Sequence, residues 1–143
     1  MTEGEIRQNI SYNENLIQGY LGQKTKVKSE IEELEALKVR LSNFQFEFAS
    51  RQETRRAGLK KYLGFNFRNN IFLSYIDGME QLLNGQEYKD TYNGLTTATE
   101  KVKSKIYEKC SELSEIENNL SYRIQRKSYW EQQLRNYYNT KEN

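Results

Sequence analysis

The chain contains no proline and no histidine, and it has a single cysteine, Cys110. Proline removes a backbone donor and clashes with the preceding turn, so without it no helix is forcibly interrupted. Without histidine the chain lacks the commonest general base and the commonest metal ligand. A single cysteine excludes an internal disulfide and a cysteine-rich zinc site. These absences argue against an enzyme, a resident metal ion and a cofactor.

Long hydrophobic runs are also missing from the sequence. No apolar stretch approaches the ~18 residues that a membrane-spanning helix needs, so we expect no membrane insertion. The first ten residues, MTEGEIRQNI, lack the hydrophobic core of a secretory leader. We therefore expect a cytoplasmic protein without a Sec signal peptide, for which any export would use another route.

The residues that are present form a mixture typical of long amphipathic helices. Hydrophobic residues make up 36% and charged residues 29% of the 143 residues, which suits helices whose surface is large relative to their core. A chain of this length corresponds to a single helical domain. Cys110 lies in helical phase with Ile106 and Leu113, so we expect it to be buried as a small hydrophobe.

Two long stretches show apolar residues at helical spacing. The first covers about residues 6–48 and includes Ile6, Ile10, Ile17, Tyr20, Val27, Ile31, Leu34, Leu41 and Phe48. The second covers about residues 95–138, after a start signal at Asn93 and Gly94, and includes Leu95, Val102, Ile106, Leu113, Ile116, Leu120, Ile124, Trp130, Leu134 and Tyr138. Stretches of equal length with a short connection predict two long antiparallel helices. Gly19 and Gly22 predict a local bend in the first.

Shorter helical patterns occupy about residues 52–84 on either side of Gly64, and a C-cap signal follows at Asn84 and Gly85. The predicted fold class is therefore all-α, an elongated antiparallel helical hairpin or bundle with short central helices around a Tyr-Leu-Gly turn. Acidic stretches such as SEIEELEA are interleaved with the apolar pattern, which indicates solvated helix faces and no paired-carboxylate site. Gly58 to Gly64 lacks the Gly-Lys-Ser/Thr ending of a phosphate-binding loop.

Positive charge is concentrated in one segment, residues 51–68, with six basic residues and one acid. We expect its members to face solvent and to influence partner choice, namely Arg51, Arg55, Arg56, Lys60 and Lys61. A basic patch beside aromatic residues could bind single-stranded nucleic acid. The formal net charge of +2 disfavours nucleic acid as the partner.

Aromatic residues gather towards the ends of the predicted helices. Phe46 lies about 200° around a helix from Phe44 and Phe48, so one buried face cannot hold all three rings. Such apolar surface usually marks a protein–protein site, and the alternative is that the middle helices cover it. The predicted partner-binding anchors are Phe44, Phe46, Phe72 and Trp130.

The central stretch KKYLGFNFRNNIF (Lys60 to Phe72) resembles the Trp-x-Gly turn of small helical proteins of type VII secretion, with Tyr62 in the place of the tryptophan and Gly64 as the glycine. A glycine can take the left-handed conformation that ends a helix, and we expect Tyr62 to pack beside it. The long helices before and after this turn are similar to the YwqH-like family of proteins associated with LXG toxins. The resemblance covers about residues 24–134, and the missing tryptophan departs from the motif.

This resemblance implies a binding function with no catalysis. In Gram-positive bacteria, proteins of this kind act as chaperone-like targeting factors that pair with the N-terminal helical region of an LXG toxin. A second small helical protein can join this complex. Tyr138 and Glu142 match the Tyr-x-x-x-Asp/Glu tail signal of related substrates, so the chain could itself be exported. The alternatives are a self-associating coiled-coil scaffold and, less favoured, a helical nucleic-acid-binding protein. A strict coiled-coil repeat from Ile6 places polar residues on the apolar stripe, at Asn13, Lys24, Lys38 and Gln45.

Overall fold

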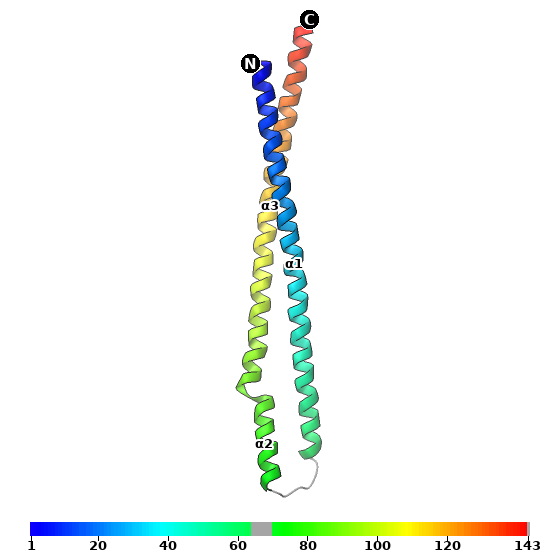
Figure 1. Ribbon diagram of the computed structural model, residues 1–143, viewed down its shortest axis with the longest axis vertical. Coiled ribbons are helices and arrows are strands. Elements are labelled where there is room, and N and C mark those ends of the chain that lie inside the picture. Colours follow the sequence, from blue (N-terminus) through cyan, green and yellow to red (C-terminus); the bar gives the residue numbers. More distant parts are fainter. Residues whose placement is uncertain (64–69, 143) are drawn as a thin grey trace. The chain divides into compact units, whose positions relative to one another are not determined.

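The computed structural model describes residues 1–63 and 70–142, which form three helices (Figure 1). These are α1 (Glu3–Leu63), α2 (Asn70–Asn84) and α3 (Gln86–Glu142). No strand occurs in the described ranges, so the predicted all-α class is confirmed. The chain divides into two compact units, each of which contains a segment of α1 and a segment of α3. Unit 1 comprises Met1–Glu33 with Ile106–Asn143, and unit 2 comprises Leu34–Lys105.

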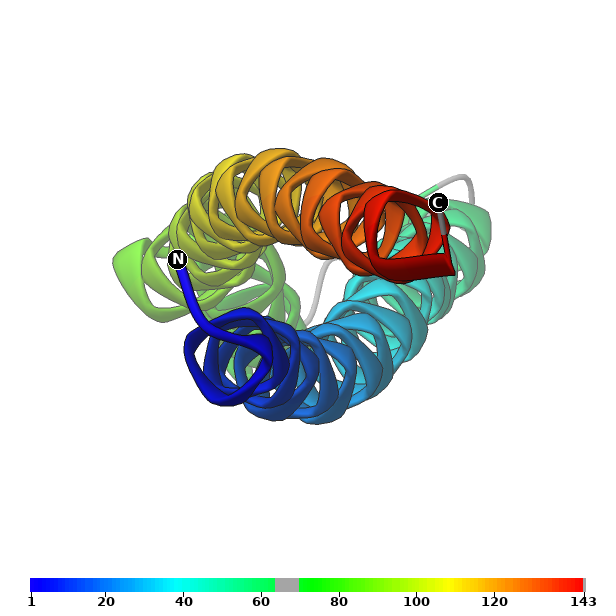
Figure 2. The ribbon, with the colours of Figure 1, turned by 90° about the horizontal axis from the view of Figure 1, so that it is seen from above.

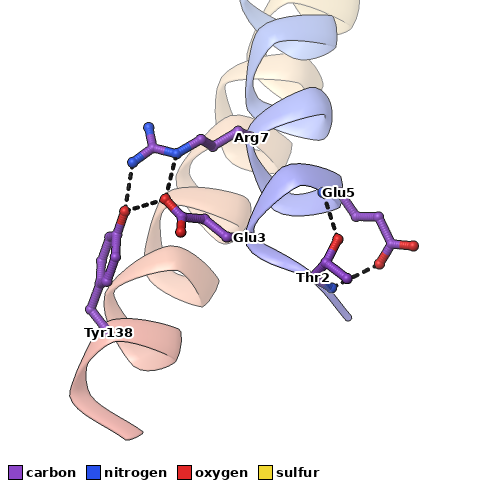
Figure 3. Close-up of polar contacts among 5 residues, drawn as sticks. All are labelled: Thr2, Glu3, Glu5, Arg7 and Tyr138. Carbon is purple, nitrogen blue, oxygen red and sulfur yellow. Dashed lines mark hydrogen bonds and ion pairs between the residues drawn. The ribbon is translucent and has the colours of Figure 1, made fainter. Parts of the chain in front are cut away.

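Helix α1 begins with a capping box. The Thr2 amide donates to the Glu5 carboxylate (2.9 Å), and the Glu5 amide donates to the Thr2 hydroxyl (3.2 Å) (Figure 3). This reciprocal pair satisfies amides that the first helical turn would otherwise leave without partners. The helix then continues without a break through Gly19 and Gly22, and the local bend expected there stays a prediction.

Two of the predicted helix boundaries are wrong. The first long helix continues past residue 48 to Leu63, and the last begins at Gln86, ahead of the predicted start near residue 95. In unit 2 the Phe48 and Tyr88 rings stack with centroids 5.1 Å apart. This contact and that of the Arg56 guanidinium over the Tyr88 ring (5.6 Å) extend the packed face beyond both predicted limits, and packing outweighs the weak local signals for a break. The predicted end of the middle helix at Asn84 is confirmed.

The α1 and α3 segments of unit 1 run antiparallel and lie side by side in both views (Figure 1, Figure 2). Ion pairs between them follow this direction, because α1 residues further along the chain contact α3 residues nearer to its start. The pairs are Glu14 with Lys127, Lys24 with Glu117, and Glu30 with Lys109. Both termini consequently lie at the same end of unit 1.

In each helix of unit 1, one series of buried and half-buried residues follows a strict heptad with alternating steps of three and four, and further half-buried residues such as Leu16 and Gln133 lie beside it. The members of the series in α1 are Ile6, Ile10, Asn13, Ile17, Tyr20, Lys24, Val27 and Ile31. In α3 they are Ile106, Lys109, Leu113, Ile116, Leu120, Arg123, Lys127, Trp130, Leu134 and Tyr137. We call these positions the seam, and their spacing is that of a coiled coil.

Polar residues therefore occupy seam positions, where the sequence pattern suggested gaps in the apolar stripe. Asn13 is only 2% exposed, and its side chain donates to the Asn9 carbonyl (2.8 Å) and accepts from Arg123 (3.4 Å). Three residues that were assigned to the packed face lie outside it, and the first is Tyr138, which is 38% exposed. Ile124 is 50% exposed, and Cys110, which we expected to be buried, is exposed.

Unit 2 contains the remaining parts of α1 and α3 together with α2. The side chain of Gln45 donates to the Tyr92 carbonyl (3.2 Å) and to the Thr96 hydroxyl (2.7 Å), and Ile76 of α2 is buried. Gly85 separates α2 from α3. A Cβ on this residue would lie 2.4 Å from the Gln81 carbonyl oxygen, so the close approach of the backbone requires glycine there.

Candidate partner-binding surface

The two predicted anchors in α1 lie on different sides of the helix. Phe44 is 57% and Phe46 is 74% exposed, while Phe48 points to the Tyr88 ring. This is the arrangement expected for residues two positions apart on a helix. The described side chains of unit 2 therefore leave Phe44 and Phe46 exposed to solvent. Those side chains do not cover the two rings in the way that the alternative required.

Of the other two predicted anchors, the structure describes the side chain of Trp130 and not that of Phe72. Trp130 is half-buried on the seam of unit 1 and meets Tyr129 edge to face, with ring centroids 5.1 Å apart. Its ring also meets the guanidinium group of Arg126, so both of these contacts are with residues of its own helix. The side chain of Phe72 lies outside the described part of the chain, as do Gly64 and the Tyr62 side chain. The predicted left-handed turn at Gly64 stays a prediction.

The tail tyrosine forms a polar cluster with the start of α1 (Figure 3). The Tyr138 hydroxyl donates to the Glu3 carboxylate (2.5 Å), and Arg7 donates both to that hydroxyl (2.6 Å) and to the same carboxylate (2.8 Å). We call these three residues the terminal clasp. The Tyr138 hydrogen bond, followed by that of Arg7, holds the pKa of Glu3 below its usual 4.5. Glu142, the second residue of the proposed tail signal, is exposed.

Ion pairs across the seam form the second polar feature of unit 1. The ammonium group of Lys127 contacts the Glu14 carboxylate, which lowers the pKa of Glu14 and raises that of Lys127. Lys109 binds Glu30 of the other helix (2.5 Å) and Glu112 of its own helix (3.3 Å). These contacts raise the pKa of Lys109, mainly through Glu30. Long basic side chains thus bury their stems on the seam while their charged ends reach carboxylates at its edge.

The stability of unit 1 is expected to fall at both acidic and alkaline pH. Because the pKa values of Glu3 and Glu14 are lowered from 4.5, their stabilisation is present above pH 4.5 and is lost as pH falls through the lowered values. The pKa values of Lys109 and Lys127 are raised from 10.5, so their stabilisation is present below pH 10.5 and is lost as pH rises through the raised values. The melting midpoint, followed by the fluorescence of Trp130, should be level between about pH 5 and pH 10.

The acid limb of this profile has a matched control. Replacing both carboxylates, Glu3→Gln with Glu14→Gln, should lower the midpoint at neutral pH and flatten its fall below pH 4.5. The alkaline limb should persist, because Lys109 keeps both of its carboxylates. An acid limb that is equally steep in the double variant would show that these two carboxylates are not its cause.

In unit 1 the predicted gathering of aromatic residues includes two arginine side chains, whose part in it was not predicted. The Arg123 guanidinium lies over the rings of Tyr12 (5.6 Å) and Tyr122 (5.1 Å), and that of Arg126 lies over Tyr129 (4.8 Å). We call these five residues the tyrosine–arginine face, and its three tyrosines are exposed. The alternation of arginine and aromatic residues in YRIQRKSYW was its sequence signal. Joining it to Tyr12 required the antiparallel register.

The basic segment of α1 is largely as predicted. Arg51, Arg55 and Lys61 are exposed, whereas Arg56 is half-buried with its guanidinium 5.6 Å from the centre of the Tyr88 ring. The side chain of Lys60 is outside the described part. Unit 2 also holds an open cavity of about 400 Å³ between its three helices, lined in part by Phe48, Arg55, Met79 and Tyr88.

The described part of the chain shows no metal-binding cluster of three or more histidine, cysteine, aspartate or glutamate side chains. Within the same ranges no helix has both the length and the apolarity needed to cross a membrane. Compared with family models, with curated proteins and with solved structures, the chain matches none of them.

Proposed function

We propose that this protein is a non-enzymatic partner of an LXG toxin, which binds the helical N-terminal region of the toxin and targets it for type VII secretion. The observation that carries the proposal is the exposure of large apolar side chains along helices that bury little. In unit 2 alone these include Leu37, Val39, Phe44, Phe46, Leu73, Tyr75 and Leu82. Exposed apolar surface of this kind usually marks an interaction site.

The sequence resemblance supplies the identity of the partner. The stretch KKYLGFNFRNNIF follows a long helix and precedes another, and it resembles the turn of secretion-associated helical proteins. A toxin region that is itself helical would lay its apolar stripe along the exposed positions of α1, as amphipathic helices do in hydrophobic grooves. In this proposal Phe44 and Phe46 are the anchors and the flanking charges set specificity.

In this proposal the tail signal also has a structural context. The terminal clasp holds Tyr138 against Glu3 and Arg7, while Glu142 is exposed one turn further along α3. A secretion component that recognises both residues would reach the exposed Glu142 side chain directly. It would have to displace Tyr138 from its hydrogen bonds with Glu3 and Arg7 of α1.

Self-association as a coiled-coil scaffold is the second candidate, and the strict heptad favours it. Both α1 and α3 carry unbroken steps of three and four on their packed faces, which is the spacing that lets helices of several chains pair. In unit 1, however, each seam faces the other helix of the same chain, as the ion pair of Lys24 with Glu117 shows. A scaffold would therefore have to use the exposed positions and not the seam.

Co-expression with the helical N-terminal region of an LXG toxin that is encoded beside this protein tests the proposal. The two proteins should co-purify, and Phe44→Ala with Phe46→Ala should weaken the complex by about tenfold or more, since truncating central aromatic anchors has effects of this size. The matched control is Tyr107→Ala, which removes an aromatic side chain that is 79% exposed in unit 1 and should leave affinity unchanged. Absence of a complex at micromolar concentrations would refute the proposal, and a homo-oligomer that the double variant dissociates would establish the scaffold instead.

A further inference from the structure

The tyrosine–arginine face has a composition that is typical of binding hot spots. Tyrosine, tryptophan and arginine dominate the residues whose truncation weakens protein complexes most. In unit 1 Tyr122 and Tyr129 lie seven residues apart on α3, which is two helical turns or ~10.5 Å along the axis. Trp130 adjoins them at the seam, with the Arg126 guanidinium 5.7 Å from its ring centre. The face therefore forms a strip along the helix axis.

The two guanidinium groups of this strip are held in place but are not neutralised. Arg123 is fixed between two rings and a hydrogen bond to Asn13, and Arg126 lies over Tyr129 and Trp130. Across the described residues no carboxylate forms an ion pair with either of them. Lysines on the same pair of helices behave differently, because Lys24, Lys109 and Lys127 each contact a glutamate of the opposite helix.

We propose that the tyrosine–arginine face docks the acidic face of a helical segment from a partner protein. A guanidinium group binds carboxylates through two parallel hydrogen bonds, and stacking on tyrosine rings fixes the plane from which those bonds extend. Because the side chains are already ordered, little rotamer freedom is lost when the partner binds. Glutamates spaced three or four residues apart on the partner would meet Arg123 and Arg126, which are themselves three apart.

Single-stranded nucleic acid is the other ligand that stacks on tyrosine and pairs with arginine. A nucleic-acid groove needs positive charge that continues along the strand, since affinity comes from many phosphate contacts. Here the next basic side chain, Lys127, is already neutralised by Glu14 and Glu131. Two free guanidinium groups match a short carboxylate pattern better than an extended polyanion.

The proposal is independent of the proposed toxin partnership, because it rests only on the charges and rings of unit 1. Its probe contains no toxin sequence. A 21-residue alanine-based helical peptide would carry glutamates at positions three and four apart on one face with leucines beside them, and a second peptide would carry glutamine in place of each glutamate. Isothermal titration calorimetry, with the peptide added to the full chain, should show that the glutamate peptide binds and that its affinity falls as salt is added.

Variants of the face separate its contributions. Arg123→Gln with Arg126→Gln, and separately Tyr122→Ala with Tyr129→Ala, should each weaken binding of the glutamate peptide about tenfold or more. Arg135→Gln is the matched control, because among the described residues this exposed arginine of α3 bonds only to Gln132 and has no ring beneath it. Binding by Arg135→Gln should equal that of the unaltered chain, and circular dichroism should show the same helix content in every variant.

Three results would overturn the proposal. The first is no binding of the glutamate peptide at about 1 mM, the dissociation constant of a weak complex. The second is equal binding of the glutamine peptide, since this would leave the guanidinium groups without a role. The third is tighter binding of oligothymidylate than of the glutamate peptide, which would identify the face as a nucleic-acid site.

Discussion

Replacing Leu120 by alanine is expected to destabilise unit 1 by about 2–3 kcal/mol, near the lower end of the range for buried leucines. Leu120 is 7% exposed on the seam, so its truncation removes apolar contacts and leaves a void between the two helices. The void is open to water at the edges of a two-helix seam, which limits the cavity contribution. Because single domains are only marginally stable, a loss of this size is a large fraction of the total free energy of unfolding.

Denaturant unfolding followed by the fluorescence of Trp130, the single tryptophan, measures this loss in unit 1. Ile124→Ala is the matched control, since Ile124 lies one turn further along α3 and is 50% exposed. That change should stay within about 0.5 kcal/mol of the unaltered protein. If Ile124→Ala proves as costly as Leu120→Ala, the packed face of α3 follows the apolar pattern of the sequence and not the heptad.

The contrast between Leu120 and Ile124 shows which parts of the fold could be predicted from the sequence. The all-α class and the two long antiparallel helices were predictable, because apolar residues recur at helical spacing over most of the chain. The exact residues of the seam were not predictable. A search for apolar residues selects Cys110 and Ile124, whereas the observed heptad has Lys109 and Arg123 at the seam positions beside them. Long basic side chains are tolerated there since their stems are apolar and their charges reach the edge.

The candidate surfaces were predictable to different degrees. That Phe44 and Phe46 cannot both be buried follows from helix geometry alone, since residues two positions apart do not share a face of the helix. The terminal clasp and the tyrosine–arginine face could not be found in this way, because each joins residues more than 100 positions apart. Glu3 meets Tyr138, and Tyr12 meets Arg123, only once the register of the antiparallel helices is known.

Replacing Asn13 by leucine is expected to raise the stability of unit 1 by about 1 kcal/mol and to abolish its unique pairing. Asn13 is 2% exposed on the seam, and a buried polar seam residue specifies register and oligomeric state at a cost in stability. Its hydrogen bond with Arg123 of α3 can form only in the observed register, whereas its bond to the Asn9 carbonyl lies within α1. A leucine packs equally well in shifted registers and against other copies of the chain, so several assemblies become similar in free energy.

Light scattering after size-exclusion chromatography should therefore resolve a mixture of species for Asn13→Leu, with a melting midpoint above that of the unaltered protein. Asn15→Leu is the matched control, because it adds the same leucine two residues away at an exposed position of α1 and should leave a single species. A single species for Asn13→Leu with raised stability would show that the ion pairs of Lys24, Lys109 and Lys127 suffice to fix the register. A lowered midpoint would instead mean that the hydrogen bonds of Asn13 stabilise the seam more than a leucine side chain does.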